Sequence, residues 1–282
     1  MIMSKVDLSV QTLLENDDVH LEPVNKRIKV YKLPDWITEE ELDELSQTAL
    51  DNDCDKIIFY VRADQKETSI AEELSFIYEG EIQGFFQGED ALIYARYLNP
   101  DRGRAGTGNV IPRLKELNIQ EQTGVKHLPE GYDIRWAEEK DAEEMAELYR
   151  EVFPKYPTPI HDPSYIKQLM REEVYFSLIH DRHQLVSSCS ADLFPEFNAA
   201  EFTDCATLPS HRGKGLLSCQ YPHLEEKMKH LGVQTMFSYT RAASMGMNIV
   251  ARQQGFTFGG CMIQNSMIGS GLEDMNIWYK AL

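Results

Sequence analysis

The run Pro209-Ser-His-Arg-Gly-Lys-Gly-Leu-Leu-Ser218 has the clearest chemical potential in this chain. Gly213 and Gly215 allow a tight turn and let a ligand approach the backbone without meeting a Cβ atom. A helix that follows such a turn presents unpaired N–H groups and a partial positive charge at its first residues. The run therefore predicts a pyrophosphate site, with an ordinary glycine turn as the alternative. It is not a Walker A loop, because the spacing that ends in Gly-Lys-Ser/Thr is missing.

Other reactive residue types give weaker signals. His180 and His183 stand where a hairpin turn is expected, so we predict no metal site. Cys205 and Cys219 have no indicated histidine partner, and burial explains them better than a nucleophilic role. The five cysteines are an odd number without C-x-x-C spacing, which argues against a disulfide framework and favours a cytoplasmic location.

Composition narrows the choice of ligand. The 282 residues allow one large domain or two smaller ones, and the 42% hydrophobic content is enough for a full core. The net charge of −18 opposes binding to nucleic acid or to anionic lipid. No apolar run is long enough to span a membrane. The charge favours a cationic small-molecule substrate, although an acidic surface that only aids solubility is the simpler explanation.

Periodicity predicts a mixture of strands and helices. In the first half, alternation and β-rich runs predict four strands, and a capping box at Thr38 begins the first of two helices. A cluster of Pro, Gly and Asn at 99–108 begins a linker that ends near Pro129. The second half has the order β-α-α-β-β-β-α-β-α-β-β, with helices near 141–153, 165–171, 216–231 and 244–254. This order predicts an α/β sandwich around a mixed sheet.

The two halves share a sequence pattern. The segments Glu89–Leu98 and Glu273–Leu282 match in residue type at five positions, and strand, Arg-Ala, helix and Phe recur at 62–76 and 241–256. We interpret the first half as a partial copy of the end of the second half, with chance similarity as the alternative.

The stretch Ala200–Leu217 resembles the acetyl-CoA motif R-x-x-G-x-G/A of the GNAT acetyltransferases, and Gly255-Phe256 resembles their usual Gly-Phe before a late strand. The resemblance covers residues 132–282. It implies a GNAT-type mixed-sheet α/β sandwich at 129–282, preceded by a smaller partial GNAT-like α/β domain with a linker at 1–128. It also implies acetyl-CoA as co-substrate, held by Ala206, Thr207, Leu208, Arg212, Gly213, Lys214, Gly215, Leu216, Leu217 and Ser218.

The same resemblance suggests catalytic residues. Glu201 has the position of the glutamate that serves as the base in some GNAT enzymes, and Asp204 follows on the same strand. A carboxylate is useful because an amine with a pKa near 10.4 is almost fully protonated at neutral pH. The family's frequent acid, a tyrosine, is Ala251 here. Tyr239 and Tyr279 are therefore the candidates to protonate the CoA thiolate, which could also leave unaided.

Two further departures limit the likeness. The last Gly/Ala of the motif is Leu217, and the family's frequent asparagine is Ser244. The stretch of the first half that corresponds to the phosphate loop, Leu33–Glu41, has carboxylates and no glycine. We therefore predict that residues 1–128 bind no CoA and extend the sheet, cover the active half or mediate pairing, so that a homodimer is possible.

A closer resemblance is to the β-lysine N-acetyltransferases. It rests on the runs Thr203–Ser218, Arg241–Asn248, Gly259-Gly260 and Met275–Lys280. It implies transfer of acetyl to the ε-amine of β-lysine, which gives the compatible solute N6-acetyl-β-lysine, with Arg241 and Trp278 as substrate-binding residues. Arg241 or Lys280 could hold the substrate carboxylate. Another small amine, a polyamine or a protein lysine is the alternative substrate, and a non-catalytic acyl-CoA-binding module is the alternative function.

Overall fold

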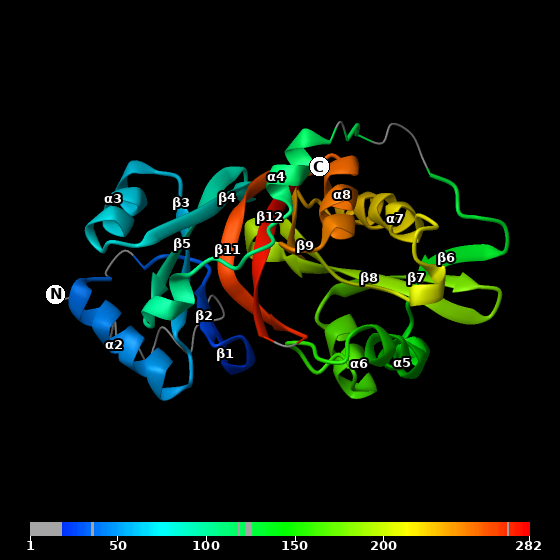
Figure 1. Ribbon diagram of the computed structural model, residues 1–282, viewed down its shortest axis with the longest axis horizontal. Coiled ribbons are helices and arrows are strands. Elements are labelled where there is room, and N and C mark those ends of the chain that lie inside the picture. The colour runs from blue at the N-terminus through cyan, green and yellow to red at the C-terminus, as the bar shows by residue number, and fades with distance from the viewer. Residues whose placement is uncertain (1–18, 35–36, 118, 122–125, 270) are drawn as a thin grey trace, which may run out of the picture.

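The computed structural model describes the whole chain apart from residues 1–18, 35–36, 118, 122–125 and 270. Twelve strands form one sheet (Figure 1). The strands are β1 (Val19–Glu22), β2 (Arg27–Val30), β3 (Lys56–Arg62), β4 (Ile77–Phe86), β5 (Glu89–Tyr97), β6 (Tyr132–Trp136), β7 (Val174–Asp181), β8 (Gln184–Phe194), β9 (Ala199–Thr207), β10 (Thr235–Arg241), β11 (Thr257–Ile268) and β12 (Gly271–Ala281). The α-helices are α2 (Glu39–Asp51), α3 (Gln65–Glu73), α4 (Ile111–Glu116), α5 (Ala142–Val152), α6 (Pro163–Arg171), α7 (Leu216–His230) and α8 (Met245–Gln253).

The predicted α/β fold class is confirmed, and the four helices predicted in the second half lie within two residues of their expected ends. The capping box at Thr38 is present, with Glu41 as its partner. Strands β4 and β11 are longer than predicted, because each continues through a stretch of irregular pairing. Strand β1 was not predicted.

The sheet has the order β1-β2-β3-β5-β4-β11-β12-β10-β9-β8-β7-β6. Two sets of five strands share the same order and directions along the sheet. They are β1, β2, β3, β5 and β4 in the first half and β8, β9, β10, β12 and β11 in the second. In each set a glycine that follows a bulge pairs with an isoleucine, Gly80 with Ile93 and Gly260 with Ile277. Those isoleucines in turn pair with Tyr60 and Tyr239. The two copies of the repeat inferred from the sequence therefore have the same strand topology and the same register as each other.

The two sets of strands meet where β4 and β11 pair at Gly80 and Gly260. Both glycines have positive φ, of +155° and +148°, and a Cβ atom on Gly80 would lie 2.6 Å from the carbonyl oxygen of Gly259. Beside this crossing, the buried Lys56 donates to Glu79 at 2.9 Å and to the carbonyl oxygen of Ile263 at 2.8 Å. A polar junction therefore ties β3, β4 and β11 together.

The apolar core is divided among the layers. Helices α5 and α6 cover one face of strands β7 to β9, and α7 and α8 cover the other face, as Figure 1 shows. On the α5 side, a cluster rich in aromatic residues lies between the N-terminal strands and the C-terminal ones; it includes Tyr31, Tyr60, Phe85, Phe194, Phe197 and Phe237. The N-terminal strands are therefore packed against the face of β9 and β10 that α7 and α8 leave uncovered.

Candidate active site

The loop before α7 has the geometry of an anion cradle. Gly213 and Gly215 adopt φ values of +77° and +75°, which a side chain would strain. Gly215 is the N-cap of α7, a helix of 15 residues with no acidic side chain in its first turn. The first amides of the helix are thus left for an anion. Among the described residues, no atom beyond Gly213 and its two chain neighbours lies within 4 Å of a Cβ built on Gly213. Leu216 and Ser218 are buried beneath this turn.

Three cations surround the cradle. Arg212 is anchored by its Nε, which donates to the carbonyl oxygen of Thr207 at 3.1 Å, and Lys214 lies over the ring of Tyr132. Lys126, from the linker, reaches the loop from outside: its Nζ stands against Gly215, at the place where a Cβ atom would be. We did not predict Lys126, because nothing in its local sequence sets it apart from any other linker lysine.

The sheet opens beside this loop. Strands β9 and β10 pair in parallel only from Ala199 to Glu201, although both strands continue beyond. Strand β9 diverges from β10 near Asp204, which has a positive φ, and near a bulge in the pairing of β9 with β8. The N–H of Leu208 is bonded to Val186 on β8, so the antiparallel alternation turns the N–H of Thr207 into the gap. This gap is where an extended thioester arm could pair with the backbone.

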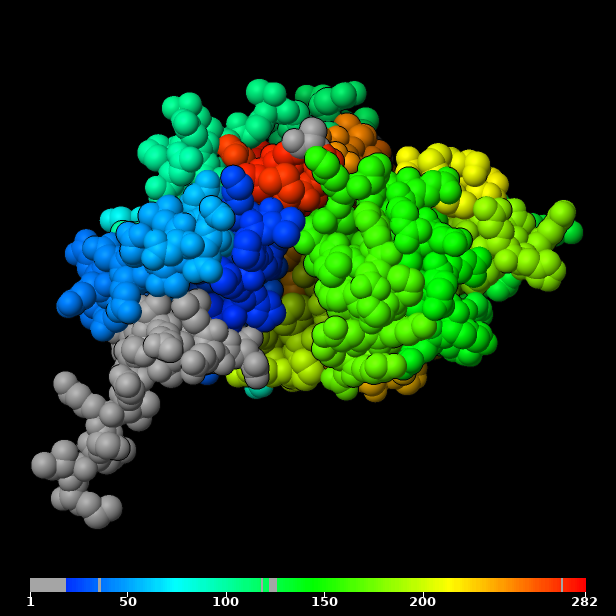
Figure 2. Space-filling model, turned by 90° about the horizontal axis from the view of Figure 1, so that it is seen from below, coloured from blue at the N-terminus to red at the C-terminus, as the bar shows by residue number. Residues whose placement is uncertain are grey.

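Three carboxylates gather on the face of β8 and β9 that is turned away from α7. We call Asp192, Glu201 and Asp204 the carboxylate cluster. Asp192 stands directly opposite Glu201 in the sheet, and Asp204 accepts hydrogen bonds from Tyr156 at 2.7 Å and Ser190 at 2.9 Å. Strands that carry this cluster form the floor of a hollow between the blue surface of β1 and β2 and the green surface of α5 and α6 (Figure 2).

Burial and mutual repulsion perturb these acids. Burial raises the pKa of Glu201 to about 7, the charge of Lys29 opposes this shift, and the Asp192 and Asp204 carboxylates reinforce it. Burial and the neighbouring Asp204 raise the pKa of Asp192 to about 6. Glu201 is therefore balanced between its two protonation states near neutral pH, which suits a group that must accept a proton in each turnover.

The other wall of the hollow comes from the first half of the chain. Tyr60 and Tyr239, which hold equivalent positions in the two strand sets, share a hydrogen bond of 2.5 Å between their hydroxyls. Tyr31 packs its ring against Phe194 at 5.4 Å. The pKa values of Tyr31, Tyr60 and Tyr239 are all raised, first by burial and in part by the charge of Glu201. Tyr239 is thus the predicted tyrosine that lies beside Glu201.

Comparison with known proteins agrees with this geometry. The profile of the acetyltransferase (GNAT) family matches residues 142–256. The N-acetyltransferase YodP of Bacillus subtilis is 34% identical over the whole of both chains. The chain belongs to the GNAT acetyltransferase family. Two proteins named β-lysine N(6)-acetyltransferase are also similar: that of Methanosarcina mazei is 33% identical over 80% of this chain and 91% of its own, and that of Methanococcus maripaludis is 26% identical over 96% and 99%.

As a GNAT acetyltransferase, the protein is an acyltransferase, and proteins of this family bind acetyl-CoA. The cradle before α7 and the gap between β9 and β10 fit such a ligand in shape and charge. In the part of the chain that the structure describes, no group of His, Cys, Asp or Glu side chains is arranged to hold a metal ion. No described helix has the length and apolar character needed to cross a membrane.

Several residues named from the resemblance lie away from the carboxylate cluster. The hydroxyl of Tyr279 donates to Glu81 at 3.4 Å, on β4. Trp278 is fully buried on the α7 side of the sheet, where its Nε1 donates to Thr240 and Asn248. Ala251, at the family's tyrosine position, is also completely buried.

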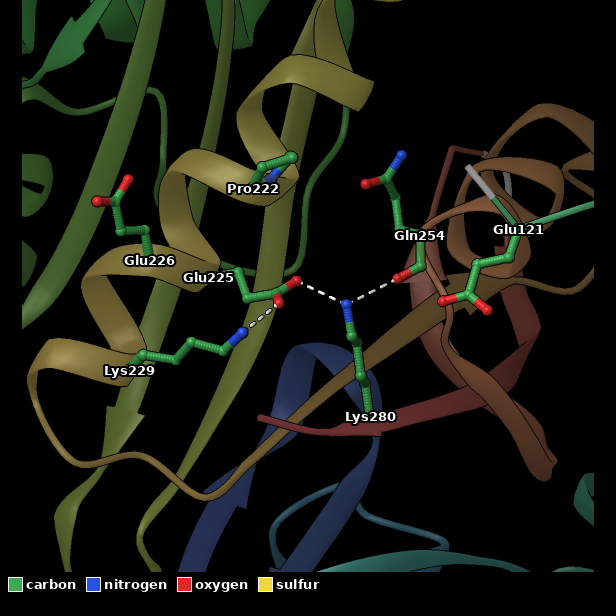
Figure 3. Close-up of a pocket in the computed structure, with 7 residues that line it drawn as sticks. All are labelled: Glu121, Pro222, Glu225, Glu226, Lys229, Gln254 and Lys280. Atoms are coloured by element: carbon green, nitrogen blue, oxygen red, sulfur yellow. Dashed lines mark hydrogen bonds and ion pairs between the residues drawn. The ribbon is translucent and has the colours of Figure 1, made fainter. Parts of the chain in front are cut away.

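The two expected carboxylate anchors are engaged with other acids. Arg241 forms a two-pronged pair with Glu273, at 2.6 and 2.7 Å. Lys280 lines a pocket between α7 and β12, where it bridges Glu225 and the carbonyl oxygen of Gln254 (Figure 3). This pocket is on the face of the sheet that carries Trp278, so Lys280 is separated by the sheet from Glu201.

Proposed function

We propose that this acetyltransferase transfers the acetyl group of acetyl-CoA to the ε-amine of β-lysine and forms N6-acetyl-β-lysine. The observation that carries this proposal is the carboxylate cluster beside the opening between β9 and β10. A substrate with two ammonium groups is stabilised by several carboxylates in a partly buried site. The names of the two archaeal relatives support β-lysine as that substrate.

The cradle and the gap define how acetyl-CoA would lie. The amides at Gly213, Lys214 and Gly215 and those of Leu216, Leu217 and Ser218 would hold the pyrophosphate, with Lys126 and Arg212 adding charge. The arm would extend along Ala206, Thr207 and Leu208, where Thr207 offers its N–H. Leu217 replaces the small residue of the family motif, so its side chain would lie against the ligand.

Glu201 would act as the base. The substrate ammonium gives one proton to Glu201, directly or through water, and the neutral nitrogen attacks the thioester carbon. The C–N bond forms, the C–S bond breaks, and the electron pair leaves with sulfur. The second proton of the amine passes to the thiolate, directly or by way of solvent, so each turnover yields an amide, the free CoA thiol and one released proton. Asp204 would position the ammonium rather than take the proton, because Tyr156 and Ser190 already occupy its oxygens.

Thiolate protonation is the less constrained step. Ala251 supplies no proton, and the hydroxyl of Tyr239 is already shared with Tyr60. Tyr239 is the remaining tyrosine candidate, because Tyr279 is turned toward Glu81. A thiol with an ordinary pKa near 8.5 can also leave as the thiolate.

We assign the acetyltransferase site to residues 129–282, with Lys126 of the linker adding charge to its cradle. To residues 1–128 we assign a wall of the substrate hollow, with no CoA site of their own. The equivalent of the phosphate loop, Leu33–Glu41, lies partly outside the described residues. What supports the assignment is its composition, without glycine and with Glu39, Glu40 and Glu41 at the start of α2.

The test is release of free thiol from acetyl-CoA, with β-lysine, α-lysine, spermidine and a lysine peptide offered separately. Turnover confined to β-lysine, with the product acetylated on its ε-amine, supports the proposal. Turnover of spermidine or the peptide in its place would assign another amine. CoA binding without turnover of any amine would favour the non-catalytic module, for which the buried Ala251 is the specific argument.

A further inference from the structure

Lys29 places a positive charge beside the carboxylate cluster, although it belongs to the first half of the chain. It is on β2 and is only 6% exposed. In the pairing of β2 with β3, Lys29 lies opposite Ile58, two residues before Tyr60. In the pairing of β9 with β10, Glu201 lies opposite Phe237, two residues before Tyr239. Since Tyr60 and Tyr239 are equivalent, Lys29 and Glu201 are equivalent as well. The repeat thus brings a base and a cation from matching positions to one site.

The contacts of Lys29 are with Glu22 and with tyrosines that border this site. Its Nζ is 3.4 Å from a carboxylate oxygen of Glu22 and donates to the hydroxyl of Tyr31 at 3.2 Å. The same atom is 5.8 Å from the ring centre of Tyr239. Of the cations that lower the pKa of Glu201, Lys29 has the larger effect, and it also lowers that of Asp192.

Three other cations have partners elsewhere. Arg27, also on β2, donates to Glu22 and to the carbonyl oxygen of Asn265, at the far end of β11. Arg241 and Lys280 are held by Glu273 and Glu225. Lys29 is also paired with Glu22, but its charge acts on Glu201 and Asp192, and its Nζ lies 5.8 Å from the ring centre of Tyr239.

We infer that Lys29 binds the carboxylate of the amino-acid substrate, so that the N-terminal repeat selects diamino acids over simple diamines; this rests on the proposed function. The reasoning is one of charge. The carboxylate cluster attracts two ammonium groups whether or not the molecule carries a carboxylate. A buried ammonium beside the cluster repels a pure polyamine and forms a charge-assisted hydrogen bond with a carboxylate.

The experiment compares β-lysine with 1,4-diaminopentane, which has the same amine spacing without the carboxylate. Lys29→Met removes the charge and keeps the length of the side chain, and Lys29→Arg retains the charge. Lys32→Met is the matched control, because Lys32 is exposed just beyond β2. Both amines are assayed on each protein, so any effect of Lys29 on Glu201 enters both rates and cancels in the ratio of their kcat/KM values.

We expect Lys29→Met to lower the ratio, β-lysine over diaminopentane, by about ten- to a hundred-fold. Calorimetry on the CoA-bound protein should show the same weakening of β-lysine binding. Lys29→Arg should retain most of the preference, and Lys32→Met all of it. An unchanged ratio in Lys29→Met would overturn the inference while leaving the proposed function in place. A wild-type protein that does not acetylate β-lysine would overturn the proposed function itself.

Discussion

Replacing Glu201 by glutamine removes the carboxylate that we propose as the base and keeps the shape of the side chain. Because the pKa of Glu201 is raised to about 7, the wild-type base is about half ionised at pH 7 and almost fully ionised at pH 9. Its contribution to the rate therefore rises only about two-fold over this interval. Below pH 7 the wild-type rate should fall as the carboxylate becomes protonated.

Without the carboxylate, the Glu201→Gln variant can use only the fraction of substrate amine that is already neutral in solution. The neutral fraction of an amine with a pKa near 10.4 rises about tenfold per pH unit, or about a hundred-fold from pH 7 to pH 9. The loss of kcat in Glu201→Gln should then be about fifty-fold smaller at pH 9 than at pH 7. At pH 7 the loss should be in the range of about 10²- to 10⁴-fold that a general base supplies.

The assay is initial thiol release at saturating β-lysine and acetyl-CoA over this pH range. Glu226→Gln is the matched control, because Glu226 is exposed on α7, across the sheet from the cluster. Equal losses at pH 7 and pH 9 in Glu201→Gln would exclude Glu201 as the base. A control that lost activity in parallel would point to a general effect of charge.

Three other substitutions test separate parts of the structure. Gly215→Ala forces a side chain into left-handed backbone and against Lys126, so KM for acetyl-CoA should rise about tenfold in steady-state kinetics; an unchanged KM would contradict the cradle. Glu79→Ala leaves the Lys56 ammonium buried without its partner, and urea denaturation should show a loss of about 3–5 kcal/mol in unfolding free energy. Trp278→Phe removes buried hydrogen bonds and should cost about 1–3 kcal/mol in the same measurement, with KM for β-lysine unchanged; a raised KM would return Trp278 to the substrate site.

Local patterns allowed the glycine turn before α7 to be predicted. The turn at Gly213 and Gly215 is set by residues that are adjacent in the chain, so its conformation follows from their types. The match of Glu89 with Glu273 likewise reflects strands that occupy equivalent places in the two halves. Such features depend on the order of residues within one element, which a sequence displays directly.

The substrate side could not be predicted in the same way. The charge of Lys29 acts on Glu201 only because two distant strand sets pack face to face, and Asp192 is inside a strand with no motif around it. Trp278 shows a further limit: neighbouring residues of a strand face opposite sides, so a correctly placed strand does not tell which face of the sheet a given side chain lies on. The sequence showed which residues belong to a strand, but it did not show which residue of the first half faces Glu201 across the hollow.

The crossing at Gly80 and Gly260 has a consequence for how the protein unfolds. Because one sheet runs through both halves and an aromatic cluster lies between them, the halves should melt in a single cooperative transition. Proteolytic removal of residues 1–128 would uncover the long edge of β11 and the apolar face behind it. An exposed edge of this length pairs readily with other chains, so the remaining fragment should aggregate rather than persist as a smaller enzyme.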